Sequence, residues 1–496
     1  MISFEEFTRL AQQGNVIPLY EELPVDTETP VSVYQKVRPL SPLSVLLESV
    51  EGGEHIARYS FLGFNPFMKL TIDGDKFRVE ALHEDVRVLP GLARQAGGPL
   101  DALKTIFDHL KSVRVPGLPR FAGGAVGYFG YECVRLVERI PEAPPDDLSI
   151  PDAVLLFFDV VIVFDNVKHQ VVIVSNAYVP NPNADDTILR KEYNAAAAEI
   201  GRVKEILGRG LPIPNRRNME IGEKSQLLAR ETYCSMVESA KRYIAAGDVF
   251  QVVLSHRARQ VATADPFDVY RNLRRINPSP YMYFLAMGDF SIVGCSPEML
   301  VRIEGDIVHT RPIAGTRRRG TTEAEDALLE RSLLEDPKER SEHLMLVDLG
   351  RNDLGRICTY GSVHVKDFMK VEKYSHVMHI VSEIRGRLKP GLSVIEGLFA
   401  CFPAGTLTGA PKIRAMEIIA ETEPVRRGVY GGAIAYIDFS GNLDSCITIR
   451  TIVAQRDTFY FQAGAGIVHD SIPGREYEET MEKMNATMLA VEMMKR

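Results

Sequence analysis

The sequence predicts a large protein in which β-strands and α-helices are mixed, because two kinds of hydrophobic pattern occur along the chain. Short runs that alternate or are continuously apolar indicate strands, and apolar residues spaced three and four apart indicate helices. The 496 residues, 45% of them hydrophobic, can bury a large core. This length favours two or more domains, or one large mixed domain with a smaller partner.

The N-terminal part of the chain holds most of the strand patterns. A helix is predicted at 3–10, with Ser3 as its N-cap and Glu6 reaching back. Prolines 18, 24 and 30 mark an extended segment after it. Further strands are predicted at 44–49, 58–63, 69–72, 76–81, 121–131, 154–164 and 170–175, and helices at 101–110 and around 195–198. The glycine-rich strand at 121–131 is not a dinucleotide fingerprint, because no helix of the right periodicity follows its glycines.

A punctuated stretch at 211–218 (LPIPNRRN) predicts a boundary near residue 215, between an N-terminal region, 1–215, and a core, 216–496. The core begins with a helix at 230–246 and a strand at 248–255. Asp336 and the proline after it predict a helix start, and Gly350 its end. The run 401–412 predicts a glycine-rich turn into a helix. Its lysine spacing excludes a phosphate-binding loop.

Composition excludes several classes of protein. A net charge of −8 and a pI near 5.9 argue against a nucleic-acid partner, which needs a basic surface. No apolar run is long enough to span a membrane, and the N-terminus does not resemble a signal peptide, so a cytoplasmic protein is expected. The six scattered cysteines, without a C-x-x-C pair, predict free thiols in a reducing compartment.

The stretch 462–483 near the C-terminus carries the strongest chemical signal. Gly464, Ala465 and Gly466 follow an alternating run at 458–461, and glycines at a strand end let backbone amides bind an anion.

A helix is predicted from near Arg475, and it places Glu476, Glu479 and Lys483 on one face. Alone, these charges favour a solvated helix face. Beside the glycine turn, they indicate a divalent cation that bridges the protein to an acidic ligand.

GAGIV, a turn and E-x-x-E-T-x-x-x-K closely resemble the chorismate-binding enzymes, as do PIAGT, SEHLMLVDLGRND and GTLTGAPK. This family makes anthranilate, aminodeoxychorismate, isochorismate or salicylate. The resemblance covers nearly the whole chain. It implies an α+β fold in which antiparallel β-sheets pack face to face, with helices on the outside and a cleft between.

Two positions favour the anthranilate-forming branch of the family. Gln251 stands where isochorismate and salicylate synthases carry a lysine that activates water, and an amide cannot act as that base. Ala314 stands where aminodeoxychorismate synthases typically carry a nucleophilic lysine. Those synthases remain the nearer alternatives, and a non-catalytic tryptophan sensor is the more distant one.

The resemblance also implies roles for single residues. Glu298, which by pattern alone is a turn acid, would be the general acid, and it needs a dry site to stay protonated. His379, by default a core histidine, would assist the elimination step, and Gln251 and Thr406 would face the substrate. The chorismate-binding residues would be Gly315, Thr316, Tyr430, Arg450, Gly464, Ala465, Gly466 and Lys483.

Magnesium is the cofactor that the resemblance implies. Glu342 and Glu479 would be its ligands, with Glu476 close behind, because Mg²⁺ prefers oxygen donors.

Feedback inhibition by L-tryptophan is a further implication. In the family, an LLES segment and an N-P-S-P-Y-M motif line the inhibitor pocket. Here they supply Glu48 and Ser49, and Pro280, Tyr281 and Met282. By pattern alone, LLES is an ordinary half-buried strand.

Ammonia would have to come from another chain, because no G-x-C-x-G-type elbow of a glutaminase is present. We therefore expect a separate glutamine amidotransferase subunit, in a hetero-oligomer with two copies of each chain.

Overall fold

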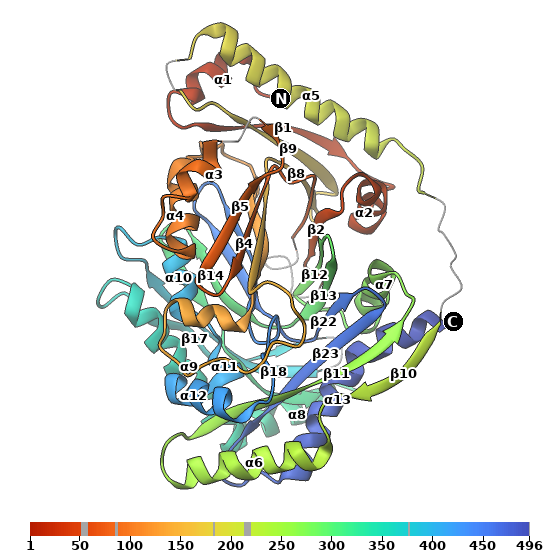
Figure 1. Cartoon of the computed structure of the whole chain (residues 1–496), viewed down its shortest axis with the longest axis vertical. Coiled ribbons are helices and arrows are strands. Elements are labelled where there is room, and N and C mark those ends of the chain that lie inside the picture. The colour runs from red at the N-terminus through yellow and green to blue at the C-terminus, as the bar shows by residue number, and fades with distance from the viewer. Residues whose placement is uncertain (51–57, 85–87, 182–183, 213–219, 375–376, 496) are drawn as a thin grey trace.

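Two large antiparallel sheets form the framework of the chain (Figure 1). The computed structural model describes all residues except 51–57, 85–87, 182–183, 213–219, 375–376 and 496. The order of the first sheet is β1-β9-β8-β3-β2-β12-β13-β22-β23-β11-β10. Its strands are β1 (Val16–Pro24), β2 (Leu43–Glu48), β3 (Tyr59–Phe64), β8 (Val160–Asp165), β9 (Gln170–Tyr178), β10 (Ile221–Gln226), β11 (Gln251–Ala262), β12 (Tyr281–Met287), β13 (Phe290–Ser296), β22 (Thr451–Gln455), β23 (Thr458–Ile467) and β19 (Gly409–Ala410), which pairs with β11.

The second sheet has the order β16-β18-β15-β14-β21-β20-β6-β7-β4-β5, and β17 pairs with β18. Its strands are β4 (Met68–Asp73), β5 (Lys76–Ala81), β6 (Gly124–Phe129), β7 (Ala153–Phe158), β14 (Met299–Glu304), β15 (Ile307–Thr310), β16 (Ile313–Arg318), β17 (His364–Lys373), β18 (Val377–Arg387), β20 (Ala433–Asp438) and β21 (Leu443–Ile447).

The inner faces of the two sheets pack against each other. One buried cluster joins Val45 and Leu285 of the first sheet to Val126 and Leu156 of the second. Gly63 permits this approach, because a Cβ atom there would lie 2.9 Å from the ring of Phe158. Face-to-face packing of antiparallel sheets confirms the predicted α+β fold.

Helices cover the outer faces of both sheets, and Figure 1 shows α1 and α5 at one end of the molecule and α6 and α13 at the other. The helices are α1 (Phe4–Ala11), α2 (Pro30–Val37), α3 (Val88–Ala93), α4 (Pro99–His109), α5 (Asp186–Leu207), α6 (Arg230–Ala245), α7 (Pro266–Ile276), α8 (Glu323–Glu335), α9 (Pro337–Ile357), α10 (Val394–Cys401), α11 (Gly405–Thr408), α12 (Lys412–Thr422) and α13 (Pro473–Glu492). Short 3₁₀ helices lie at Arg38–Leu40, Tyr131–Leu136 and Met493–Lys495.

Most of the predicted elements are confirmed, with local differences. The hydroxyl of Ser3 accepts the Glu6 amide at 3.2 Å, but the Glu6 carboxylate bonds to Arg9 instead of capping back. The predicted strand at 154–164 is two strands, β7 and β8, which lie in different sheets. The chain changes sheet at Asp159, whose carbonyl accepts the Asn176 amide at 2.8 Å. Both halves are continuously apolar, so the pattern could not show this break.

The prediction that Gly350 ends a helix is wrong, because α9 continues to Ile357. A Cβ atom at Gly350 would lie 2.8 Å from Ile384, so this glycine lets the helix approach β18 closely. Beyond it, Leu354 and Ile357 are buried and Asp353 pairs with Lys412 at 2.9 Å. This packing outweighs the low helix propensity of one glycine.

The proposed boundary at residue 215 lies outside the described residues and stays a prediction. Strands on either side of it pair in both sheets, β2 with β12 and β6 with β20. All six cysteines are free thiols. None of the described helices combines the length and apolar composition that crossing a bilayer requires.

Candidate active site

The glycine segment at 464–466 was predicted to follow a strand. It lies inside a strand instead, β23. It pairs with β11, so that Gly464 is opposite Ser255 and Gly466 opposite Val253. Cβ atoms there would lie 2.9 Å from the Tyr430 hydroxyl and 2.6 Å from the Gln251 amide nitrogen. The glycines therefore make room for two side chains that lie directly over the strand.

Helix α13 is tied to this strand by Lys483. Its ammonium donates to the Gly464 carbonyl at 3.0 Å and pairs with Glu479 at 2.7 Å. Both side chains are about half exposed, at 47% and 49%. Lys483 therefore places a positive charge at the open side of the glycine segment.

Carboxylates of α9 and α13 interact through their charges. Burial raises the pKa of Glu342, and the negative charge of Glu479 raises it further. Burial and the same charge raise the pKa of Glu476. The charges of Glu342 and Glu479, which are far apart in the sequence, thus influence each other in the folded chain.

These carboxylates fit a hard cation such as Mg²⁺, because they supply only oxygen donors and their mutual repulsion would be relieved by it. Within the described residues, no three or more His, Cys, Asp or Glu side chains gather closely enough to form a metal cage of their own. A cation here would take its other ligands from water and from a bound acid, as Mg²⁺ commonly does.

Glu298 lies between β13 and β14, where the chain passes from one sheet to the other. It is only 9% exposed, and the Thr406 hydroxyl donates to its carboxyl oxygen at 3.2 Å. Burial raises its pKa to about 8. Both side chains line a cavity whose walls include Leu346, Leu349 and Asp353. With this pKa, Glu298 is mostly protonated at neutral pH and can donate a proton into this cavity.

His379 on β18 is held by a bulge in β16. The register of the pair shifts between Ala314 and Thr316, and Gly315 adopts a φ of +69°, which favours glycine. The Gly315 carbonyl lies 3.0 Å from Nδ1 of His379, and the Thr316 hydroxyl 3.1 Å. A carbonyl only accepts, so Nδ1 carries the proton and Nε2 keeps a lone pair. Burial lowers the pKa of His379, which keeps the ring neutral.

Arg450 lies between β21 and β22 in a left-handed conformation, with a φ of 49°. Its carbonyl accepts the Cys295 amide at 3.2 Å, and its positive charge contributes to the lowered pKa of His379. Tyr430 is buried, and its hydroxyl faces the Gly464 amide, as the effect of this amide on its pKa shows. Arg450 and Tyr430 thus lie close to the elements that carry His379 and the glycines, respectively.

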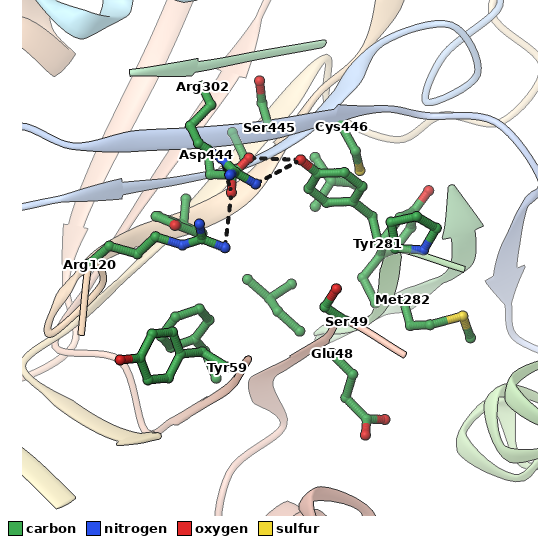
Figure 2. A pocket seen from close by; sticks show the side chains of 17 residues that line it. Glu48, Ser49, Tyr59, Arg120, Tyr281, Met282, Arg302, Asp444, Ser445 and Cys446 are labelled. Atoms are coloured by element: carbon green, nitrogen blue, oxygen red, sulfur yellow. Dashed lines mark hydrogen bonds and ion pairs between the residues drawn. The ribbon is translucent and has the colours of Figure 1, made fainter. Parts of the chain in front are cut away.

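A second pocket lies between the sheets (Figure 2). Glu48, Ser49, Pro280, Tyr281 and Met282, predicted to bind tryptophan, all line it, because β2 pairs with β12 and Met282 is opposite Glu48. The Ser49 hydroxyl is buried and has no hydrogen-bond partner among the described residues.

The Glu48 carboxylate points away from the polar end of this second pocket, as Figure 2 shows. It accepts the Tyr270 hydroxyl at 2.5 Å and pairs with Arg274 at 3.2 Å. An amino group of a ligand in the pocket could reach the Glu48 carboxylate from the side that faces Tyr270 and Arg274, or after Glu48 changes its rotamer.

Sequence reasoning missed the polar group at the other end of this pocket. Asp444 accepts Tyr281 at 3.1 Å and pairs with Arg302 at 2.9 Å and with Arg120 at 3.6 Å (Figure 2). It also missed the buried pair of Glu423 and Arg427 beneath the glycine segment. Isolated charged residues in strands and at a helix end carry no pattern that would have singled them out.

Comparisons with known proteins identify the family to which this chain belongs. The family model described as chorismate binding enzyme matches residues 47–489. The chain therefore belongs to the chorismate-binding enzyme family, which confirms the resemblance. Its curated relatives within that family include proteins named anthranilate synthase component 1. The one from Acetivibrio thermocellus is 46% identical over 498 residues, with 99% of this chain and 98% of the relative covered. The one from Aquifex aeolicus is 44% identical over 499 residues, with 99% and 98% covered.

Solved structures agree with this placement. Anthranilate synthase component I from Streptococcus pneumoniae is 38% identical, with a TM-score of 0.75, and the match covers 87% of this chain and 92% of that one. The menaquinone-specific isochorismate synthase from Escherichia coli has a TM-score of 0.68 over 98% of both chains. At 17% identity, it shows a shared fold alone.

Proposed function

We propose that this chain converts chorismate and ammonia into anthranilate and pyruvate, the first committed step of tryptophan biosynthesis. The observation that carries the proposal is a site with a protonated carboxyl group, Glu298, but no nucleophilic or water-activating side chain at positions 251 and 314. Ammonia is then the nucleophile. The names of the full-length relatives support the same activity.

Chorismate is a dianion, and a protein with a net charge of −8 repels it overall. Binding therefore needs positive groups at the site itself. Arg450 would pair with the enolpyruvyl carboxylate through its planar fork. Tyr430, Lys483 and the 464–466 backbone would orient the same end. Gly315 and Thr316 would hold the ring.

Magnesium, held by Glu342 and Glu479 with Glu476 behind them, would neutralise the ring carboxylate. The chain's own groups then perform the proton transfers. Glu298, oriented by Thr406, donates a proton to the departing ring hydroxyl as ammonia attacks ring carbon 2. His379 Nε2, which carries no proton in this tautomer, accepts the proton of ring carbon 2 as the bond between the ring and the enolpyruvyl oxygen breaks and pyruvate leaves.

The ammonia would come from a separate glutamine amidotransferase subunit, which the word component in the names of the relatives supports. We propose an assembly with two copies of each chain.

L-Tryptophan would bind the pocket of Figure 2 and favour a state that does not accept chorismate. The indole would lie among the apolar lining residues, and the Ser49 hydroxyl, which no group of the described residues engages, offers a hydrogen bond.

The test is product fluorescence and chromatography with the purified chain, chorismate, Mg²⁺ and either ammonium or glutamine. We expect anthranilate with ammonium and essentially none with glutamine alone. Isochorismate, salicylate or aminodeoxychorismate as the product would overturn the proposed reaction. Equal rates with glutamine would overturn the separate subunit.

A further inference from the structure

Arg427, in the loop between α12 and β20, has one of the largest fully buried side chains of the described residues. Its guanidinium pairs with Glu423, Nε to one carboxylate oxygen at 2.9 Å and a terminal nitrogen to the other at 2.6 Å. The exposed fractions of the two side chains are 1% and 4%. A charge pair buried this deeply is tolerated only when its remaining polar atoms are also bonded.

The remaining donors of Arg427 reach two backbone carbonyls, those of Leu407 at 2.7 Å and Val253 at 2.8 Å. Its guanidinium carbon lies 4.7 Å from the ring centre of Tyr131 and 5.7 Å from that of Tyr430. The guanidinium therefore has fixed neighbours along its edges and over its face.

Glu423 extends the same network to β11. Its carboxylate accepts the Ser255 amide at 2.7 Å and the Ser255 hydroxyl at 3.0 Å. From the other side, the buried Glu132 accepts the backbone amides of Arg427 and Gly428 at 3.1 and 3.0 Å. Side chain and backbone of Arg427 are thus both anchored.

These contacts join three segments that carry the proposed active site. Val253 and Ser255 lie opposite Gly466 and Gly464 in the sheet. Leu407 directly follows Thr406, whose hydroxyl bonds to Glu298. Tyr430 follows Arg427 by three residues and lies over Gly464.

We propose that Arg427 is a positioning residue for this reaction, one that sets the distance between the proton donor and the groups that bind the enolpyruvyl end of the substrate. The inference rests on the proposed function. In the proposed reaction, Arg427 touches none of the reacting atoms. It acts through Leu407, Val253 and Tyr430.

The effect of the Glu423–Arg427 pair on stability can be separated from its effect on the positions of its partners. A buried ion pair is often no more stabilising than an apolar pair of the same volume, whereas loss of one partner leaves an unpaired buried charge. The rigid fork of an arginine, however, sets the relative positions of several acceptors at once, which apolar side chains cannot do.

The test is the double variant Glu423→Leu/Arg427→Met, which removes both charges and keeps the volume nearly constant. We expect its Tm to be lower than that of the wild type, because the Leu407 and Val253 carbonyls and the Ser255 amide lose their partners, so the kinetics are compared well below that Tm. We expect kcat with chorismate and ammonium to fall about 100-fold, because a displacement of about 1 Å can cost that much. KM for chorismate should change much less, because the groups that bind it remain.

The matched control is Glu28→Leu/Lys36→Met, which removes another ion pair, between a buried lysine and a glutamate that is 21% exposed. Lys36 is 4% exposed, pairs with Glu28 and donates to the Leu207 carbonyl at 2.7 Å, away from the site. Its kcat should equal that of the wild type. If the Glu423→Leu/Arg427→Met variant also keeps the wild-type kcat, the positioning role is wrong.

Arg427→Lys covers the case in which the double variant does not fold. A lysine keeps the charge and can reach Glu423, but its single nitrogen cannot bond both carbonyls in the same geometry. We expect a near-native Tm and a kcat reduced by about tenfold, and a wild-type kcat would overturn the proposal. A wild-type chain that makes no anthranilate would instead refute the proposed function itself.

Discussion

The buried carboxyl group of Glu298 makes the stability of this protein depend on pH in a way that one substitution should remove. Below pH 4.5, the group is protonated in both the folded and the unfolded chain and has no effect. Between pH 4.5 and about 8, the unfolded chain releases the proton while the folded chain keeps it, so the free energy of unfolding falls as the pH rises. Over the whole window, the difference is on the order of 4 kcal/mol.

The substitution Glu298→Gln keeps the shape of the side chain and cannot titrate. Relative to the wild type, we expect the variant to gain stability between pH 5 and pH 8, by up to about 4 kcal/mol. Urea unfolding followed by circular dichroism at pH 5, 6, 7 and 8 measures this difference. Glu482→Gln, at an exposed position on α13, is the control and should show no such trend. A difference between wild type and Glu298→Gln that is the same at every pH would refute the reasoning.

Three further predictions concern other parts of the molecule. Glu479→Gln should weaken Mg²⁺ binding by about tenfold or more in isothermal titration calorimetry with chorismate present, whereas Glu482→Gln should not. Ser49→Phe should fill the pocket of Figure 2 and abolish tryptophan binding, with uninhibited turnover little changed. Because the chain contains no tryptophan, the fluorescence of the ligand reports its binding directly, and full sensitivity of the variant would contradict this placement. Gly294→Ala would place a Cβ atom 2.2 Å from a buried tyrosine ring and should destabilise the fold by about 1–3 kcal/mol in urea unfolding. Gly91→Ala, which meets open space, should stay within about 1 kcal/mol of the wild type.

Local patterns predicted the secondary structure well wherever neighbouring residues decide it. Pro337 and the capping Asp336 mark the start of α9, and alternation marks β4 and β5. The patterns failed where distant packing decides. Gly350 lies inside a helix because β18 approaches it, and Asp159 separates two strands because the chain changes sheet there.

Some residues of the candidate site could be predicted from the sequence, and others were found only from their tertiary contacts. Short motifs that resemble those of the chorismate-binding family pointed to Glu298, Glu342 and Glu479. Arg427 and Asp444 belong to no such segment, and only their partners, Glu423 and Arg302 among them, reveal what they do.

The sequence by itself determined the family, the chemical groups available and the absence of a nucleophile at positions 251 and 314, because these depend on residue identity alone. Tertiary structure decided the raised pKa of Glu298, the tautomer of His379 and the interaction between carboxylate charges of α9 and α13. Those properties arise from burial and from contacts across the chain, and both exist only once the two sheets have packed.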